Sequence, residues 1–452
     1  MPTLPPALKS LSLRKLRRTN AINVFLTSAL LWLIAYTFCR LRFWRDPHSA
    51  FFNDRYVYEW RYSLYREREG RRLITNHNTL AENSSSYTGA GSNPLICAAF
   101  LTVRREEENY LEASVGSLLE GLTPLERRAL FLNVIFVDTD PSQHPSWGQN
   151  WVHRLADHVG SYQNISMDQF HHLQDLEKAR NFYEKGVFKP LTICFHLNDY
   201  IHALKACMAT NATYLAMFED DSIVADGWKA KTLKGVSDIA RIQTPKHVDN
   251  NHPWVYLRLF FTETALSWTS ADFAYRNMGW IFIGASLSLL AALMAVRRAY
   301  PSSHAYLDYP SVGVISFVSL PALIGLVFMV GKYSLMSLSG VVETNAHGCC
   351  TQGLVFPRDQ VDALIAHLTE VKAGQTDSII EEYADAKGLT RYALAPQQLQ
   401  HVGLKSSRDN LEINTRSTWA FRFEENKPAD LRKEHENLLR DVDIARLLDG
   451  HS

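Results

Sequence analysis

The 452-residue chain lacks net charge, because its 47 lysines and arginines are balanced by 47 aspartates and glutamates. Proteins that mainly bind nucleic acid usually present a basic face, so this balance argues against that class. Cysteine is also scarce, with six residues and no CxxC pair, and a zinc site is therefore not expected. Disorder is excluded for most of the chain, since 46% of the residues are hydrophobic.

Charged residues are missing from three long runs, over residues 21–39, 278–296 and 311–331. Each run approaches the roughly 20 residues that a helix needs to cross a hydrocarbon core of ~30 Å. The first run predicts a membrane anchor. The second and third contain small residues that allow close helix packing, and they predict a transmembrane hairpin. The alternative is that each run is a buried helix in the core of a large soluble protein.

The charges beside these runs predict their orientation. Every charged residue among residues 1–20 is basic, which favours a cytosolic N-terminus. Arginines also follow the first run, but the hairpin loop opens with Arg297 and Arg298 and so fits the cytosolic side as well. The segments 40–277 and 332–452 would then both be lumenal. Three glycosylation sequons lie in the first of these segments, at Asn83, Asn164 and Asn211.

These signals divide the chain into consecutive parts. The predicted parts are a cytosolic tail over residues 1–20, an anchor over 21–39, a lumenal stem over 40–92, a first domain segment over 93–277, the hairpin over 278–331 and a second domain segment over 332–452. The stem is charged and aromatic at first and then rich in serine and glycine, which is typical of a linker.

After the stem, segments typical of strands alternate with segments typical of helices. Residues 95–103, 130–140 and 213–221 predict buried strands that end in polar residues, and residues 106–122 and 198–210 predict helices. This alternation indicates an α/β fold with a parallel sheet. In open sheets of this kind, ligands bind outside the carboxyl ends of the strands.

Three adjacent carboxylates, Glu219, Asp220 and Asp221, follow the third predicted strand. Such a cluster repels itself and raises its own pKa values unless a cation compensates the charge. Hard oxygen ligands suit Mg²⁺, Mn²⁺ or Ca²⁺, and such an ion commonly holds substrate phosphates as well. The alternative is a solvated loop of acids. The preceding buried strand and the lumenal setting favour a metal and diphosphate site.

Four segments, "VIFVDTD", "FEDDSIVADGW", "CCTQGLVFP" and "GLTRYALAPQQLQHVGLKSS", together resemble the post-GPI-attachment GalNAc transferase family, and more distantly the N-acetylglucosaminyltransferase IV enzymes. The resemblance spans roughly residues 93–420. It implies a GT-A-like glycosyltransferase domain split by a tandem transmembrane pair, which would make the two domain segments the parts of one catalytic domain. It also implies a multi-pass Golgi membrane protein whose catalytic domain is lumenal.

The resemblance also implies roles for individual residues. Asp221 and His401 would be metal ligands, and Glu219 and Asp220 would face water, ribose or the donor sugar. For His401 alone, an ordinary histidine beside a strand is the alternative. The implied donor-binding residues are Thr102, Val103, Arg104, Asp138, Asp140, Asp199, Tyr200 and Asp220.

The family inverts the anomeric centre, so one carboxylate must deprotonate the acceptor hydroxyl. Asp377 stands at the start of a predicted helix and is the expected base. Helix capping is the alternative role for this residue. Glu381 and Glu382, one turn further on, are the next candidates, with a solvated helix face as the alternative for each.

The expected function is transfer of a sugar, GalNAc from a UDP donor, onto the mannose core of glycosylphosphatidylinositol (GPI) anchors. The expected cofactor is Mn²⁺ or another divalent cation, and the expected partners are the UDP-sugar and a GPI glycan or GPI-anchored protein. A hairpin within the catalytic domain suits this acceptor, because it would hold the active site close to the lipid headgroups. The alternative is a membrane-anchored glycan-binding or scaffold protein with the same fold and no turnover.

Overall fold

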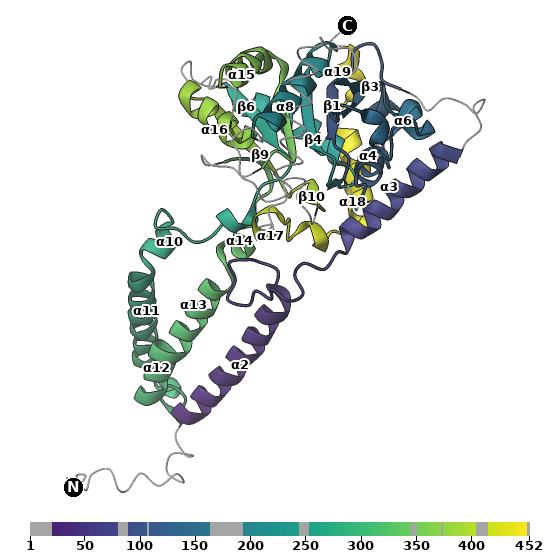
Figure 1. Cartoon of the computed structure of the whole chain (residues 1–452). Helices are drawn as coiled ribbons and strands as arrows, with labels where there is room; N and C mark the ends of the chain where they lie inside the picture. Colours follow the sequence, from purple (N-terminus) through teal and green to yellow (C-terminus); the bar gives the residue numbers. More distant parts are fainter. Residues whose placement is uncertain are drawn as a thin grey trace, which may run out of the picture. The chain divides into compact units, whose positions relative to one another are not determined.

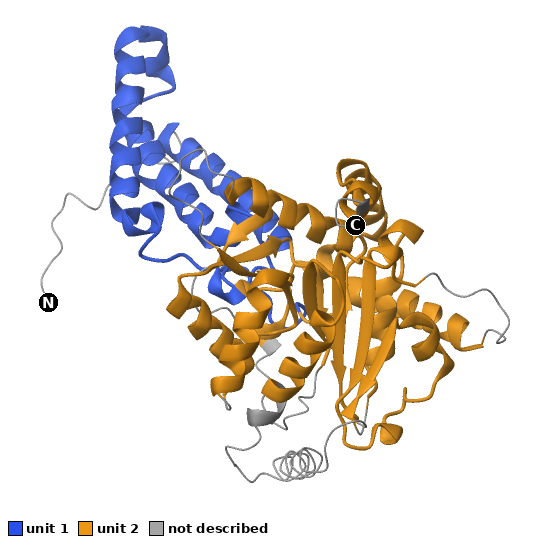
Figure 2. Ribbon diagram, turned by 90° about the horizontal axis from the view of Figure 1, so that it is seen from above, with its two compact units in different colours: residues 1–57, 264–337 blue, residues 58–263, 338–452 orange. Residues whose placement is uncertain are grey.

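The computed structural model describes residues 20–79, 89–105, 108–162, 193–243, 253–344, 350–371, 374–403 and 415–449. The chain forms two compact units, each built from separate chain segments. Unit 1 comprises residues 1–57 and 264–337, and unit 2 comprises residues 58–263 and 338–452 (Figure 2). The sequence of unit 2 is therefore interrupted by the second segment of unit 1.

Unit 1 contains the three uncharged runs as helices that are long and apolar enough to cross a membrane (Figure 1). The first is α2 (Asn20–Arg42) and the second is α11 (Met278–Ala299). The third spans Tyr309–Met329 and consists of α12 (Tyr309–Val314), a π-helical turn η7 (Ile315–Ser319) and α13 (Leu320–Met329). The structure does not support the alternative of buried core helices, because only 6%, 6% and 17% of the apolar stretches of the three helices are buried.

The anchor helix α2 packs in the same unit as the hairpin. The Ser319 hydroxyl donates to Ser28 Oγ at 2.8 Å, and Trp32 Nε1 donates to the Ala322 carbonyl at 3.0 Å. These hydrogen bonds join polar groups of otherwise apolar helices, and lipid chains offer no hydrogen-bond partners for such groups. The sequence predicted the three helices separately, and the structure joins them in one bundle.

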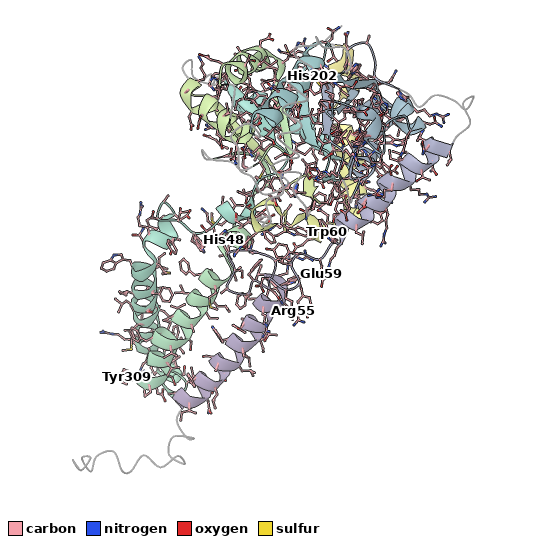
Figure 3. The ribbon with its side chains drawn as sticks, in the orientation of Figure 1. His48, Arg55, Glu59, Trp60, His202 and Tyr309 are labelled. Carbon is pink, nitrogen blue, oxygen red and sulfur yellow. A yellow bond between two sulfur atoms is a disulfide. The ribbon has the colours of Figure 1, made fainter. Side chains whose placement is uncertain are left out.

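Short elements connect the membrane helices. They are α10 (Phe273–Arg276), the 3-10 turn η6 (Pro301–Ala305) and α14 (Lys332–Leu335). In the hairpin loop, the Arg297 guanidinium lies 4.4 Å from the ring centroid of Tyr309, which Figure 3 labels. The Arg297 side chain also donates to the Leu307 carbonyl. The arginine that predicted the loop's orientation therefore also holds the loop together.

Unit 2 is built on an eight-stranded sheet with the strand order β3-β2-β1-β4-β8-β6-β9-β7. The strands are β1 (Ile96–Thr102), β2 (Leu130–Phe136), β3 (His158–Ser161), β4 (Tyr214–Glu219), β6 (Trp254–Arg258), β7 (Gly340–Glu343), β8 (Gly353–Pro357) and β9 (Thr390–Ala395). The predicted strands β1, β2 and β4 are confirmed, and with β3 they pair in parallel. The predicted parallel sheet accounts for only part of the structure, because β8 runs antiparallel to β4 and β6.

Successive residues of β1 point to opposite faces of the sheet and enter two separate cores. Ile96, Ala98 and Phe100 join one core, and Cys97 and Ala99 join the other. The first core also takes residues from α4 (Leu111–Leu119), α6 (Asn150–Leu155) and α9 (Trp228–Gln243). The second takes residues from α8 (Ile193–Met208), α15 (Arg358–Val371) and α16 (Thr376–Lys387). Helices therefore cover both faces of the sheet.

Three further features complete unit 2. A disulfide joins Cys97 of β1 to Cys207 of α8. Strands β5 (Ser222–Val224) and β10 (Leu399–His401) pair antiparallel in a small second sheet. The remaining short elements are α5 (Pro124–Arg128), η2 (Pro141–Gln143), η5 (Glu263–Ala265, which ends in unit 1), α17 (Thr415–Thr418), η8 (Phe423–Glu425), α18 (Pro428–Asp441) and α19 (Ile444–Asp449).

The predicted stem contains a helix, α3 (Tyr62–Thr79), that belongs to unit 2. It packs against α4 where Gly70 meets Gly116, since a β-carbon at Gly70 would lie 2.6 Å from the Ser117 nitrogen. Its Arg66 is 1% exposed and donates to the Ser117 and Glu120 carbonyls. Residues 62–79 are thus part of the folded unit rather than a linker.

Candidate active site

The parallel strands β1 and β4 bring their carboxyl ends to the same edge of the sheet. Leu101 pairs with Glu219 in the register between them, so Thr102 stands beside the start of the acidic cluster. The chain continues from this cluster into β5, where Ser222 pairs with His401 of β10. This antiparallel pairing brings a histidine from a distant part of the sequence next to Asp221.

Glu219, Asp221 and His401 form a group with the chemistry of a metal site. One ligand atom from each residue lies within 4.8 Å of the others. His401 Nε2 is 3.4 Å from Asp221 Oδ2. Burial alone would raise the pKa of Asp221, but the charges of His401 and Arg105 outweigh it and hold that pKa well below its usual range. The carboxylate therefore stays ionised and available as a ligand.

Two further observations fit a small divalent ion at this group. Asp221 Oδ1 is buried and has no hydrogen-bond partner within the part of the chain that the structure describes. Gly403 packs directly against the same carboxylate, because a β-carbon there would overlap Asp221 Oδ2 and lie 2.9 Å from Cγ. Two carboxylates and one imidazole are ligands that Mn²⁺ or Mg²⁺ accepts. The roles of Asp221 and His401 as ligands stay predictions.

Gly403→Ala is expected to weaken Mn²⁺ binding at least about tenfold, because the added β-carbon displaces the Asp221 carboxylate that it touches. Isothermal titration of the purified full-length protein with Mn²⁺ measures this. Gly284→Ala is a matched control, since no described atom lies within 4 Å of a β-carbon at that position. Equal Mn²⁺ affinity of the two variants would contradict the assignment of Asp221 to a metal.

Asp220 lies outside the group formed by Glu219, Asp221 and His401, and residues at and after the end of β1 hold it in place. The Thr102 hydroxyl donates to Asp220 Oδ2 at 2.8 Å, and the Ser114 hydroxyl donates to the Asp220 carbonyl. Two predicted site residues, Thr102 and Asp220, are therefore brought together. Asp220 is 5% exposed, so its orientation depends on these protein contacts.

His144, which was not predicted from the sequence, orients the Thr102 hydroxyl through a hydrogen bond. The Ser146 amide donates to His144 Nδ1 at 3.1 Å, so the proton of the neutral ring is on Nε2. Nε2 lies 3.0 Å from Thr102 Oγ1 and donates to it. Burial lowers the pKa of His144, which keeps the ring neutral. The result is a directed chain of hydrogen bonds from His144 through Thr102 to Asp220.

The other predicted donor residues near β1 and β2 lie on the segments that follow these two strands. The Arg104 amide donates to Asp138 Oδ2 at 2.7 Å, and the Arg104 side chain donates to Gln143 at 2.7 Å. Asp140 caps the turn η2 by accepting from the Ser142 amide and hydroxyl. Val103 packs against the second core. Asp138 and Asp140 thus differ, since the first is buried and the second is exposed.

Asp199 and Tyr200 of α8 face away from solvent. Asp199 accepts a hydrogen bond of 2.6 Å from the Tyr162 hydroxyl. Tyr200 is 5% exposed, and burial raises its pKa well above the usual range, with the nearby Glu219 charge adding to the effect. Tyr200 therefore lies close to the acidic cluster, whereas Asp199 contacts Tyr162, the residue directly after β3.

Asp377 lies in the first turn of α16, and a short bridge ties it to the acidic cluster. Its Oδ2 accepts from the Cys350 amide at 3.2 Å, and Thr351, the next residue, donates its hydroxyl to Glu219 at 2.6 Å. Cys350 has a φ of 78°, an unusual conformation for a residue with a side chain and one often found at functional sites. In this conformation the Cys350 amide contacts Asp377 while the neighbouring Thr351 hydroxyl contacts Glu219.

The capping alternative for Asp377 is met only in part. The N-cap of α16 is Gln375, which makes no side-chain capping bond. Asp377 Oδ1 accepts from the Ser378 amide at 2.9 Å, which satisfies one free amide of the first turn. The side chain is partly exposed, so the carboxylate can still be reached from solvent.

The prediction of a solvated face is wrong for Glu381. This residue is 4% exposed, and it accepts hydrogen bonds from the Tyr256 hydroxyl and from Arg258 Nη2 at 2.6 Å. It also forms an ion pair with Arg391, with Oε2 and Nε 2.8 Å apart. The same Arg258 also donates to the Cys350 carbonyl at 2.9 Å. Glu381 therefore has a structural role behind the bridge to Asp377, and Glu382 alone remains exposed.

Arg105 is the charged residue of this site that sequence reasoning missed. Its Nη2 contacts Asp220 Oδ1 at 2.5 Å and Asp221 Oδ2 at 3.1 Å. The doublet of arginines directly after the first predicted strand was a visible signal. Only the structure shows that the second arginine, and not the first, reaches the carboxylates.

One family model matches the chain, that of the GPI-N-acetylgalactosamine transferase PGAP4, over residues 96–400. The match begins with β1, includes the acidic cluster and Asp377, and ends one residue before His401. It covers more than half of the chain and confirms the resemblance predicted from the four motifs. No curated protein matches the chain.

Proposed function

The chain belongs to the GPI-N-acetylgalactosamine transferase PGAP4 family, and from this premise we propose its reaction, location and mechanism. Membership of this family indicates a GPI-related glycosyltransferase. The structure separately contains three candidate membrane helices among the described residues. The proposed reaction transfers GalNAc from UDP-GalNAc to a mannose of a GPI glycan, with inversion at the anomeric carbon. The proposed location is the Golgi membrane, with unit 2 in the lumen and a GT-A-like fold for that unit.

One observation carries the proposal beyond family membership. Glu219, Asp221 and His401 converge within 4.8 Å, and Thr351 and Cys350 connect this group to Asp377. A metal-dependent inverting transferase needs a cation site for the leaving diphosphate and a carboxylate for the acceptor. The link between the three-residue group and Asp377 joins side chains suited to both tasks, and this supports the proposal.

The proposed mechanism assigns each residue a separate task. Asp221, His401 and Glu219 would hold a divalent ion, which when bound would supply positive charge to neutralise the leaving diphosphate. Thr102, Asp220, Arg104 and Asp138 bind and orient the nucleotide sugar. Asp377 accepts the proton of the acceptor hydroxyl as its oxygen attacks the anomeric carbon from the face opposite the diphosphate. The bond from that carbon to phosphate breaks, and UDP leaves.

A donor screen tests this function. Purified full-length protein in detergent is incubated with UDP-GalNAc, UDP-Gal or UDP-GlcNAc, a mannose-containing GPI glycan and Mn²⁺, and released UDP is measured. We expect release with UDP-GalNAc that depends on acceptor and disappears in excess EDTA. No release with any donor would favour the alternative of a binding protein without turnover.

The proposed lumenal orientation predicts a glycan at Asn211. This residue is exposed at the end of α8 and begins the sequon completed by Thr213. Treating the protein from cells with a glycosidase should reduce its mass, and Asn211→Gln should remove part of that reduction. In sealed vesicles, an epitope at the C-terminus should resist protease added from the cytosolic side. Digestion of that epitope would refute the orientation.

A further inference from the structure

The Arg105 guanidinium places a positive charge within the group that would hold the metal. Its Nη2 is 3.1 Å from Asp221 Oδ2, and the same oxygen is 3.4 Å from His401 Nε2. The side chain is 15% exposed, and its charged end lies 5.2 Å from the ring centroid of Tyr110. The protein's own cation therefore neutralises the carboxylates on which a metal would depend.

Arg105 and a divalent ion make competing demands on Asp221. An ion bound between Asp221 and His401 would lie within a few ångströms of the guanidinium, and like charges repel strongly at a buried site. Asp220 is also engaged, since Arg105 Nη2 lies 2.5 Å from its Oδ1. Tight metal binding therefore requires that Arg105 leave the carboxylates.

The donor offers Arg105 a second partner. A guanidinium is planar and suits the oxygens of phosphate, which it binds in pairs. Arg105 lies three residues beyond the end of β1, in a stretch without helix or strand, and it follows Arg104 of the predicted donor site. Movement of this side chain from carboxylate to diphosphate would break no backbone hydrogen bond of the sheet.

We propose that Arg105 is a placeholder cation that makes metal binding conditional on the nucleotide. In the absence of nucleotide it occupies Asp220 and Asp221, and when the diphosphate binds, it transfers to the phosphate oxygens and releases Asp221 to the metal. The inference rests on the proposed function, since it takes the diphosphate and the divalent ion from that reaction. Its consequence is positive coupling, so UDP tightens Mn²⁺ binding and Mn²⁺ tightens UDP binding by the same factor.

The test measures Mn²⁺ affinity without turnover. Free Mn²⁺ is followed by electron paramagnetic resonance over full-length protein, with and without UDP and with no acceptor present. In the wild type, UDP should tighten Mn²⁺ binding at least about tenfold, within the usual range of coupling between two sites. In Arg105→Gln, Mn²⁺ alone should bind about tenfold more tightly than to the wild type, and the effect of UDP should shrink.

Three further variants make the result specific. Arg105→Met removes the charge while keeping contact with Tyr110, and it should behave as Arg105→Gln does. Arg105→Lys keeps the charge and should resemble the wild type. Arg241→Gln removes an exposed arginine of α9 and should change nothing. Thermal melting of each variant shows whether it is folded, and the comparison of wild type with and without UDP needs no variant at all.

The outcomes separate this inference from the proposed function. Equal Mn²⁺ affinity of the wild type and both uncharged variants, with Mn²⁺ still required for transfer, would overturn the placeholder role alone. Absence of coupling between UDP and Mn²⁺ in the wild type would overturn it as well. If no variant binds Mn²⁺ under any condition, both the inference and the metal-dependent mechanism are wrong.

Discussion

Asp221→Asn is expected to lower sugar transfer about a thousandfold or more. Asparagine keeps the shape of the side chain but removes the negative charge that attracts a cation, and only Glu219 and His401 of the group would remain. Stabilisation of a leaving group by a metal is worth several kcal/mol, and each 1.4 kcal/mol changes the rate about tenfold. UDP release and GalNAc transfer at saturating donor measure the loss.

The matched control is Asp362→Asn, which removes an exposed carboxylate of α15 and should transfer sugar normally. Metal titration of Asp221→Asn should show weakened Mn²⁺ binding in parallel with the lost activity. The same dependence should appear without any substitution, because excess EDTA removes the ion. An enzyme that works at full rate in EDTA, or after Asp221→Asn, would contradict the metal site.

Asp377→Asn is expected to slow transfer by about a hundredfold to ten-thousandfold, which is typical for loss of a general base. The asparagine oxygen can still accept from the Cys350 amide, so the bridge to Thr351 and Glu219 should survive. Binding of UDP and Mn²⁺ should stay near the wild-type values, because Asp377 serves the acceptor. A single-turnover measurement with bound donor isolates the chemical step.

Glu382→Gln provides the competing test on the same helix. Glu381 is no longer a candidate base, since Arg258, Arg391 and Tyr256 engage its oxygens. If Asp377→Asn transfers sugar near the normal rate and Glu382→Gln does not, the base is Glu382. If Asp377→Asn instead loses UDP binding, Asp377 belongs to the donor site.

Local patterns in the sequence predicted the three long apolar helices and the start of the sheet. The runs 21–39, 278–296 and 311–331 lack charge over a whole bilayer, and no other structure explains such runs as easily. The parallel strands β1 and β4 followed from their apolar character, and their neighbouring carboxyl ends then brought Thr102 and Asp220 together. Periodicity and residue type were sufficient for these features.

Long-range pairing could not be obtained in the same way. The residues of β8 are all buried, and a short apolar run carries no signal that it pairs antiparallel to β4. His401 reaches Asp221 only because β10 pairs with β5. The resemblance to a family suggested this histidine as a ligand, whereas its spacing along the chain did not.

Buried charges were the least predictable part of the site. Arg105, Glu381 and Arg66 are residue types usually found at the surface. Partners far away in the sequence bury Glu381 and Arg66 and leave Arg105 only 15% exposed. The folded helix α3 was not predicted for the same reason. Its polar residues indicated a linker, whereas its Arg66 is buried beside α4. A charged side chain is a poor guide to exposure when its partners are unknown.

The insertion of residues 264–337 into unit 2 has a consequence for how the protein is made. Strand β4 is synthesised before the hairpin, and its partner β8 is synthesised after it. With the proposed membrane-spanning hairpin, both must be delivered to the same side of the membrane before the sheet can close, and His401 arrives only with the later segment. A nascent chain in which one hairpin helix failed to insert would leave these halves on opposite sides. Such a chain cannot assemble the site at all, so biosynthesis yields active molecules only from correctly inserted ones.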